Sequence, residues 1–194
     1  MGQPRILALA GSARRDSFNK KLVSIAAGGA KQAGADVTVI DLADYELPLF
    51  NQDLEAEKGL PAAAVALKKL FVEHHGLLLA CPEYNSSITP LLKNTIDWVS
   101  RSAPGEPALS AYKGKVATLM SASPGALGGL RGLVHVRSIL GNIGVVVLPE
   151  QVALPTAHQA IGEDGRLKDE KMQASIEGLG RNLAVVLKKF TAGS

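Results

Sequence analysis

The sequence predicts an α/β fold in which helices cover both faces of a parallel β-sheet. Two observations lead to this prediction. Five short runs of the chain are continuously apolar rather than alternating, as expected for strands that are buried on both faces. The longer segments between these runs carry apolar residues at helical spacing. The chain of 194 residues suits a single domain, residues 1–194, and is long enough to bury a core without a disulfide or a metal ion.

The strands are expected where the short apolar runs occur. Strands that alternate with helices imply right-handed crossover connections and an open sheet. Five strands favour the order 2-1-3-4-5 of a flavodoxin-like three-layer sandwich over the six-stranded dinucleotide-binding fold. The expected strands are residues 6–10, 37–42, 76–81, 115–120 and 145–148, the last of them ending at Pro149.

The expected helices follow from apolar stripes between the strands. Thr89 and Pro90 are typical of a helix start, since threonine caps and proline suits the first helical position. Residues 127–143 are apolar on two sides, which predicts two partners, the sheet and a second subunit. A neighbouring loop over the second side is the alternative. The other helical segments are residues 18–30, 61–74, 91–99 and 172–190.

Composition and charge argue against several classes of function. The net charge is only +3, no basic run exceeds two residues, and aromatic residues make up 4% of the chain, so no nucleic-acid partner is expected. No apolar run approaches the roughly 18 residues of a membrane span, which predicts a soluble cytoplasmic protein. The four histidines show no metal-ligand spacing, so no metal site is expected.

Residues 11–19 form a polar turn between the first expected strand and helix. Gly11 lets the chain leave the strand, while Arg14 and Arg15 add positive charge. Backbone N–H groups and the positive end of the helix dipole point back at this turn, as in sites that bind one phosphate. The chain has neither a P-loop nor a G-x-G-x-x-G motif, so a mononucleotide such as FMN is favoured over a dinucleotide. An ordinary capped helix with solvated arginines is the alternative.

Residues 81–90 form a second polar turn, after the third expected strand. In the 2-1-3 order, strands one and three are neighbours, so both turns face the crevice at their carboxyl ends. Backbone groups of this turn and the Asn85 amide can hydrogen-bond the edge of a flavin ring, and Tyr84 can flank the ring. Glu83 can serve as an acceptor that stabilises the loop.

No side chain is expected to act as an acid, a base or a nucleophile. Asp97 lies four residues from both Lys93 and Arg101, so pairing on the helix surface is expected rather than acid–base chemistry with Glu83. Cys81 lies at the end of an expected buried strand and is interpreted as a packing residue.

Several motifs occur in register along the chain. They are Gly-Ser-x-Arg-x-x-Ser-x-Asn at 11–19, Leu-Pro-Leu-Phe-Asn-x-Asp at 47–53, Pro-Glu-Tyr-Asn at 82–85, Leu-Lys-Asn-x-Ile-Asp-Trp at 92–98, Ser-Ala-Ser-Pro-Gly at 121–125 and Gly-Gly-Leu-Arg at 128–131. Together they resemble the NADPH-dependent FMN reductase family, which includes bacterial quinone and chromate reductases and related azoreductases. The similarity extends over most of the chain.

The resemblance implies bound FMN, NADPH or NADH as a transient co-substrate, and a homodimer or homotetramer. It also implies ping-pong hydride transfer to the flavin, followed by reduction of a quinone, an azo compound or a metal oxyanion such as chromate. The cofactor carries this chemistry, so no catalytic residue is expected. The implied FMN-binding residues are Ser12, Arg14, Ser17 and Asn19 at the phosphate, Pro82, Glu83, Tyr84 and Asn85 along the ring, and Ser121, Ser123 and Gly125 in the turn after strand four.

Two other functions suit the same fold. One is a flavodoxin-like electron carrier without NAD(P)H activity, although such carriers tend to be strongly acidic and this chain has a pI of about 9.0. The other is a flavin-free regulatory protein. Binding of FMN and rapid oxidation of NAD(P)H would distinguish the reductase from both.

Overall fold

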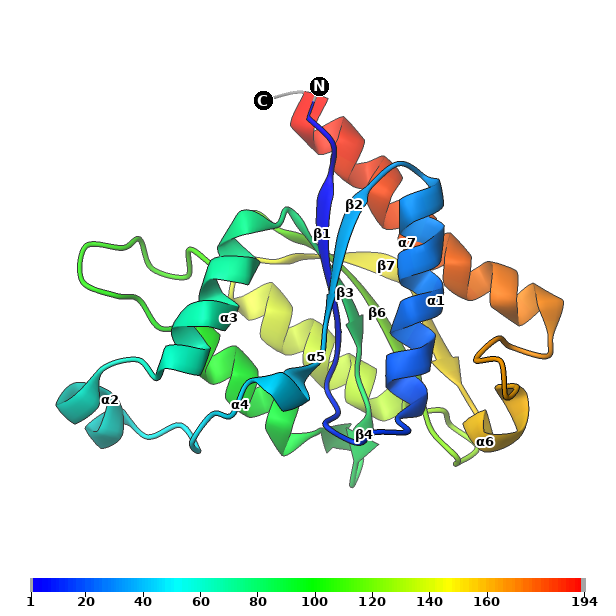
Figure 1. Cartoon of the computed structure of the whole chain (residues 1–194), viewed down its shortest axis with the longest axis horizontal. Helices are drawn as coiled ribbons and strands as arrows, with labels where there is room; N and C mark the ends of the chain where they lie inside the picture. Colours follow the sequence, from blue (N-terminus) through cyan, green and yellow to red (C-terminus); the bar gives the residue numbers. More distant parts are fainter. Residues whose placement is uncertain (1, 193–194) are drawn as a thin grey trace.

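The centre of the fold is a parallel β-sheet of five strands, seen in a computed structural model that describes residues 2–192 (Figure 1). The strand order is β2-β1-β3-β6-β7. Because β4 and β5 belong to a separate hairpin, β6 and β7 are the fourth and fifth strands of this sheet, and the expected flavodoxin-like order 2-1-3-4-5 is confirmed. All four neighbouring pairs are parallel. The strands of this sheet are β1 (Arg5–Ala10), β2 (Asp36–Ile40), β3 (Gly76–Ala80), β6 (Val116–Ala122) and β7 (Val146–Leu154).

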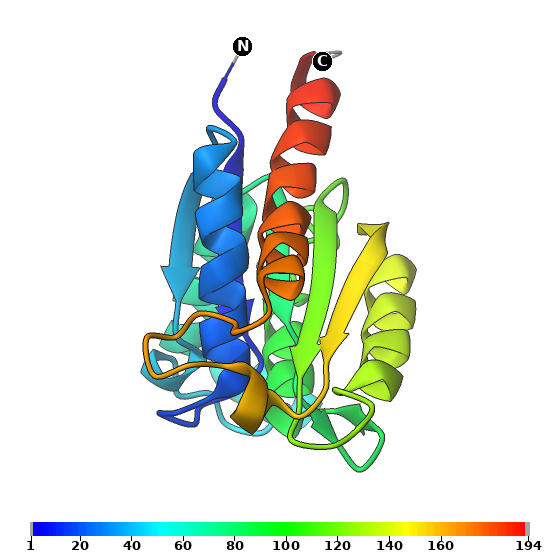
Figure 2. The same ribbon diagram turned by 90° about the vertical axis from the view of Figure 1, so that its right-hand side faces the viewer.

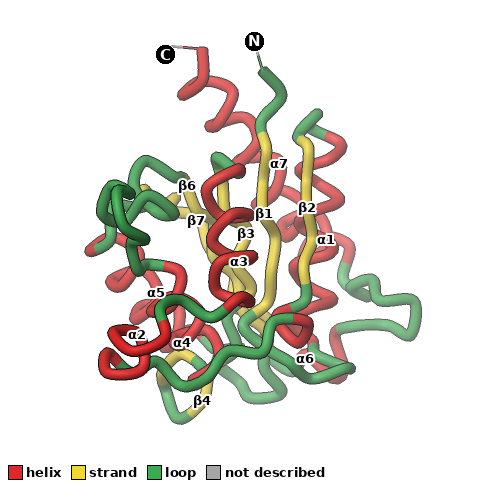
Figure 3. The backbone as a smooth tube through the Cα atoms, turned by 60° about the vertical axis from the view of Figure 1, so that its left-hand side comes forward, coloured by secondary structure: helices red, strands yellow, loops and turns green. Residues whose placement is uncertain are grey.

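Helices cover both faces of the sheet, and successive strand residues point to opposite faces. Helices α1 (Phe18–Gln32) and α7 (Glu170–Ala192) lie side by side on one face (Figure 2), where Ile6 and Ala8 of β1 join their apolar cluster. Figure 3 shows the other face with α3 in front of β1 and β3. Leu7 and Leu9 point to that face. Its helices are α3 (Ala62–Glu73), α4 (Pro90–Val99) and α5 (Leu130–Asn142).

Strand β7 is longer than the sequence predicts. It continues five residues beyond Pro149, and residues 148–150 form a bulge where its pairing with β6 shifts. A proline is tolerated here because β7 is an edge strand and the bulge needs no ladder bond from this position. Arg137 of α5 donates hydrogen bonds to the carbonyl oxygen of Val147 and to Gln151 Oε1, which satisfies acceptors on both sides of the bulge.

Five short elements were not expected from the sequence. Two of them, β4 and β5, form an antiparallel hairpin in the second polar turn. The reason for the miss is length, since elements of two to seven residues carry no periodic signal. The elements are the 3₁₀ helix η1 (Leu42–Asp44), α2 (Gln52–Lys58), β4 (Glu83–Tyr84), β5 (Ser87–Ile88) and α6 (Ala157–Ala160).

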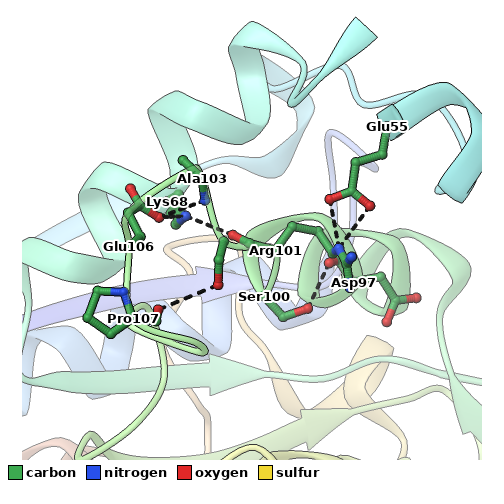
Figure 4. A network of polar contacts seen from close by, with 9 residues as sticks. Glu55, Lys68, Asp97, Ser100, Arg101, Ala103, Glu106 and Pro107 are labelled. Carbon is green, nitrogen blue, oxygen red and sulfur yellow. Dashed lines mark hydrogen bonds and ion pairs between the residues drawn. The ribbon is translucent and has the colours of Figure 1, made fainter. Parts of the chain in front are cut away.

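Helix α2 buries none of its residues and is held against the end of α4 by polar contacts (Figure 4). Arg101 Nε donates to both carboxylate oxygens of Glu55, at 2.8 and 2.9 Å. The expected pairing of Asp97 is therefore confirmed for Lys93, at 2.7 Å, and wrong for Arg101. Arg101 pairs with Glu55 instead, because α2 brings this carboxylate to the end of α4. The spacing of residues along α4 alone does not reveal this contact.

The two apolar sides of α5 have different surroundings. Leu133, Val136 and Leu140 are fully buried against the sheet. On the other side, Leu130 and Val134 are 43% and 59% exposed. The first partner predicted for this helix, the sheet, is thus confirmed.

Among the described residues, no helix is both long enough and apolar enough to cross a lipid bilayer.

One buried hydroxyl in the centre of the sheet lacks a partner. Thr118 of β6 is 1% exposed and its Oγ1 forms no hydrogen bond within the described part of the chain. Since an unsatisfied buried hydroxyl costs free energy, Thr118→Val should raise the free energy of unfolding by about 1 kcal/mol, measured by urea denaturation. The matched control is Thr95→Val, because the Thr95 hydroxyl is also buried but donates to the Leu91 carbonyl at 2.9 Å. The control should not gain stability, and equal gains would contradict the explanation.

Candidate functional site

The polar turns predicted from the sequence meet in one cleft at the carboxyl ends of β1, β3 and β6. The start of α1 and the β4–β5 hairpin lie together at this end of the sheet (Figure 1). Eight of the eleven expected site residues line the cavity, and Asn85, Ser121 and Gly125 do not. The lining residues are Ser12, Arg14, Ser17, Phe18, Asn19, Pro82, Glu83, Tyr84, Ala122, Ser123 and Pro124.

The first turn approaches the start of α4 very closely. A Cβ atom on Gly11 would lie 2.9 Å from Leu92 Cβ and 3.3 Å from Pro82 Cδ, so glycine is needed for close contact rather than for an unusual φ. Thr89 fixes the same approach from the other side. Its Oγ1 donates to the Gly11 carbonyl at 2.7 Å and accepts from Leu92 N at 3.2 Å. The expected cap of α4 therefore also ties the two turns together.

The start of α1 is suited to an anion. Ser17 is the N-cap residue, but its side chain makes no capping hydrogen bond, and no acidic residue lies in the first helical turn. The first-turn N–H groups have no intrahelical partner, and the helix dipole adds positive potential at this end. Arg14 lines the cavity and has no ion-pair partner in the described chain, while Asp16 is exposed and lies outside the lining. These groups fit a phosphate monoester.

The amide group of Asn19 forms hydrogen bonds within the protein. Its side chain is buried, and Nδ2 donates to the Ala122 carbonyl at 2.9 Å while Oδ1 accepts from Ala122 N at 3.0 Å. This pair of bonds ties the first turn of α1 to the end of β6. Asn19 thus lines the cavity, and its amide group connects two of the cavity's walls.

The β4–β5 hairpin forms the second wall of the cleft. Asn85 and Ser86 connect its strands with φ values of 50° and 67°, as in the two-residue turns that asparagine favours. This turn carries Asn85 away from the cavity. Tyr84 is 54% exposed at the edge of the cleft, where an aromatic ring can contact a flat ligand.

Glu83 joins the hairpin to the start of α5. Its Oε2 accepts from Gly132 N at 2.9 Å, and its Oε1 lies 3.4 Å from Arg131 Nη2. A carboxylate at a helix N-terminus is stabilised by the helix dipole. The expected role of Glu83 as an acceptor that stabilises the loop is confirmed, with α5 as the donor.

The third turn, after β6, closes the cleft. The sequence placed Ser121 in this turn, which is wrong: it lies within β6, is fully buried, and donates from Oγ to the Gly128 carbonyl at 2.6 Å. Ser123 lines the cavity, and its Oγ accepts from Gly125 N at 3.1 Å. Ser121 and Gly125 therefore shape the turn, whereas Ser123 faces the cleft.

Asn94 and Trp98 of α4 hold the segment after η1, a role that sequence reasoning missed. Asn94 Oδ1 accepts from Phe50 N at 2.8 Å, and both Asn94 Nδ2 and Trp98 Nε1 donate to the Pro48 carbonyl. The Phe50 and Trp98 rings are in edge-to-face contact, with their centroids 5.0 Å apart. The motifs at 47–53 and 92–98 are thus two halves of one contact, and their joint occurrence was the signal available.

Other chemistry-bearing residues lie outside the cleft or are inert. Cys81 is fully buried, and burial raises the pKa of its thiol to about 12, which suits the packing role inferred from the sequence. Within residues 2–192, no three His, Cys, Asp or Glu side chains gather to hold a metal ion.

Several known proteins are similar to this chain in sequence or structure. Residues 4–159 match the family of NADPH-dependent FMN reductases. An NAD(P)H-dependent FMN reductase of Pseudomonas aeruginosa is 33% identical over 174 residues, 89% of each chain. A quinone reductase of Escherichia coli is 34% identical over 145 residues, which are 74% of this chain and 73% of that one. The structure of FerB, a flavoenzyme NAD(P)H:(acceptor) oxidoreductase from Paracoccus denitrificans, superposes with a TM-score of 0.80 at 28% identity, covering 96% of this chain and 98% of that one.

The family match spans most of the chain and includes all three turns of the cleft. The fold agrees with it, since the flavoenzyme FerB superposes on 96% of this chain. FMN is accordingly the cofactor and NAD(P)H the co-substrate of this enzyme. The chain belongs to the NADPH-dependent FMN reductase family.

Proposed function

We propose that this enzyme uses NADPH or NADH to reduce quinones, with FMN bound in the cleft formed by the three turns. The observation that carries the proposal is the start of α1, where the Ser17 side chain makes no capping bond and Arg14 faces the cavity. A quinone acceptor is supported by the similarity to the quinone reductase of Escherichia coli. Bound FMN supplies hydride transfer between the nicotinamide and the acceptor.

The residues of the chain bind and orient in this scheme. Ser12, Arg14 and Ser17 hold the phosphate together with the first-turn N–H groups of α1. The backbone at Pro82 and Tyr84 would contact the ring, and Ser123 would close the opposite side. Donor and acceptor bind alternately, which is a ping-pong order. Azo compounds and chromate are proposed as further acceptors.

Visible absorption spectroscopy tests this function. The protein loaded with FMN is expected to bleach on anaerobic addition of NADPH or NADH, and the faster donor identifies the preferred one. Benzoquinone added next should restore the oxidised spectrum within seconds, and methyl red and chromate are then compared as acceptors. A bound flavin that stays oxidised with both donors would contradict the reductase and favour an electron carrier. Failure to bind FMN would contradict the site as well.

The phosphate assignment predicts a specific loss in Arg14→Ala. Removing a charge-assisted hydrogen bond should weaken FMN binding by about 1–3 kcal/mol, roughly 5- to 150-fold in Kd, measured by fluorescence titration of the apoprotein. The matched control is Arg15→Ala, since Arg15 is exposed and does not line the cavity. Equal losses in both variants would mean that net charge, and not a contact from Arg14, attracts the phosphate.

We also propose that the exposed side of α5 packs against a second copy of the chain, in a homodimer or homotetramer. Leu127, Leu130 and Val134 are 50%, 43% and 59% exposed and lie at or just before the helix start that Glu83 caps. Such a stripe is a candidate for burial in a subunit interface. Sedimentation velocity of the protein with FMN tests the proposal, and a monomer at micromolar concentration would contradict it.

A further inference from the structure

A second pocket lies at the opposite edge of the sheet, where β1, β3 and β6 begin. At this edge β1 begins and α7 ends (Figure 1). The cavity has a volume of about 290 Å³. Because the FMN cleft is at the carboxyl ends of the same strands, the whole length of the sheet separates the two sites. We call it the amino-edge pocket and define it by Val72, His75, Lys113, Lys115, Leu187 and Phe190.

Positive charge collects among the described residues of this pocket. Lys113 and Lys115 line it, whereas no acidic residue is among its described lining residues. Arg5 adds a third cation next to it, with Nη2 at 3.5 Å from His75 Nε2. The nearest acidic residue in sequence, Glu73, has its carboxylate 3.9 Å from Lys69 Nζ on the same helix. The pocket therefore has a positive electrostatic potential, which favours binding of an anion.

Lys115 is the buried member of this group. The residue is only 6% exposed, and its Nζ donates one hydrogen bond, to the His74 carbonyl. An ammonium group has three donors, so two remain without an acceptor among the described residues. Burial, followed by the charge of Arg5, lowers the pKa of Lys115 to about 8. A buried ammonium of this kind is costly unless an anion pairs with it.

The imidazole of His75 carries no negative charge, and its pKa is affected by the same cations. Its Nδ1 accepts a hydrogen bond from Arg5 N at 3.2 Å, which requires an unprotonated Nδ1. Burial and the charges of Arg5, Lys115 and His74 lower the pKa of His75. The imidazole is thus held neutral by the surrounding cations, and the positive potential remains for a ligand.

The rest of the pocket wall is apolar. Val72 of α3 and Phe190 of α7 are 51% and 55% exposed and contribute aliphatic and aromatic surface, whereas Val116 and Leu187 are buried. An inorganic anion would leave this surface unused, whereas an anion with a short hydrocarbon part would cover it. The combination of one buried ammonium and an apolar wall is the chemistry that recognises an amphipathic monoanion.

We propose that the amino-edge pocket binds a small organic carboxylate, with its charged end at Lys115 and its hydrocarbon part against α7. This binding is a property of the protein separate from the FMN cleft. It adds a ligand site on the far edge of the sheet and does not depend on which electron acceptor the enzyme uses.

Isothermal titration calorimetry of the FMN-loaded protein with hexanoate tests the proposal. Hexanoate should bind to the wild type and bind at least about tenfold more weakly to Lys115→Met, which keeps the length of the side chain and removes its charge. The matched control is Lys69→Met, an exposed lysine outside the pocket, which should bind hexanoate like the wild type. Hexanamide, the neutral analogue of the same size, should bind much more weakly than hexanoate.

A second measurement on the wild type keeps the test valid if Lys115→Met fails to fold. Hexanoate should raise the pH at which the ¹³Cε resonance of Lys115 titrates, because a bound carboxylate favours the ammonium form. Absence of hexanoate binding, equal binding of hexanamide, or unchanged affinity in Lys115→Met would each overturn the proposal. Stronger binding of inorganic phosphate than of hexanoate would overturn the carboxylate assignment.

Discussion

The Gly180→Ala substitution is expected to lower the free energy of unfolding by about 3 kcal/mol relative to the wild-type protein. Gly180 lies in α7, and this helix runs beside α1 (Figure 2). A Cβ atom at this position would lie 1.8 Å from the Ala26 carbonyl oxygen and 2.9 Å from Ala30 N. Both contacts are with backbone, which cannot rotate away, so the two helices must separate. Overpacking of this kind typically costs 1–3 kcal/mol, and a backbone clash lies at the upper end of that range.

The matched control for this prediction lies two residues earlier on the same helix. A Cβ atom on Gly178 meets no atom within 4 Å, so Gly178→Ala should gain about 0.5–1 kcal/mol from the higher helix propensity of alanine. Urea denaturation of the FMN-free proteins compares the two. If Gly180→Ala lowers the free energy of unfolding by less than 0.5 kcal/mol, the prediction is wrong, because the two helices then accommodate the added methyl group with little loss of stability. The reciprocal position, Gly29 of α1, faces the Glu177 carbonyl oxygen at 2.0 Å and should respond like Gly180.

These glycines mark a boundary of what the sequence reveals. Gly178 and Gly180 are two residues apart, so they point to nearly opposite sides of α7, and only Gly180 falls on the apolar stripe with Ile176 and Leu183. The stripe indicates that Gly180 faces the packed side, but only the position of α1 shows that a side chain has no room there. The fold as a whole was predictable for the opposite reason. Continuous apolar runs are a local signal, and five of them between helices leave few alternatives to the observed strand order.

The extent of β7 and the β4–β5 hairpin were not predictable in the same way. Pro149 normally ends a strand, and only the bulge with Arg137 behind it lets the strand continue. The hairpin has two residues per strand, and its turn uses Asn85 and Ser86 with positive φ. Serine is a weaker signal than glycine in the second position of such a turn, so the pattern reads as an irregular loop.

The composition of the candidate site was predictable, whereas the task of each residue was not. Polar residues after neighbouring strands must gather at one edge of the sheet, which is why eight expected residues line the cavity. Their partners, however, lie far away in the sequence. Glu83 reaches Gly132, 49 positions later, and Asn19 reaches a residue 103 positions later. Hydrogen bonds over such separations leave no periodic trace.

Asn19→Ala is expected to lower the free energy of unfolding of the FMN-free protein by about 3 kcal/mol. The substitution leaves the Ala122 N–H and C=O groups buried without their partners, at roughly 1–3 kcal/mol for each unsatisfied group. Urea denaturation measures the loss. Asp16→Ala is the matched control, because Asp16 is an exposed residue of the same turn and should change stability by less than 0.5 kcal/mol.

The same variant distinguishes a positioning residue from a phosphate ligand. If Asn19 positions the cleft, its loss destabilises the apoprotein, and FMN binds more weakly because the first turn of α1 is no longer tied to β6. A ligand that is not part of the protein's own packing would behave differently: FMN affinity would fall while the stability of the apoprotein stayed within 0.5 kcal/mol of wild type. That second outcome would restore the role that the sequence motif suggests and would mean that the bonds to Ala122 contribute little. The size of the stability loss without FMN is therefore the quantity that decides between the two roles.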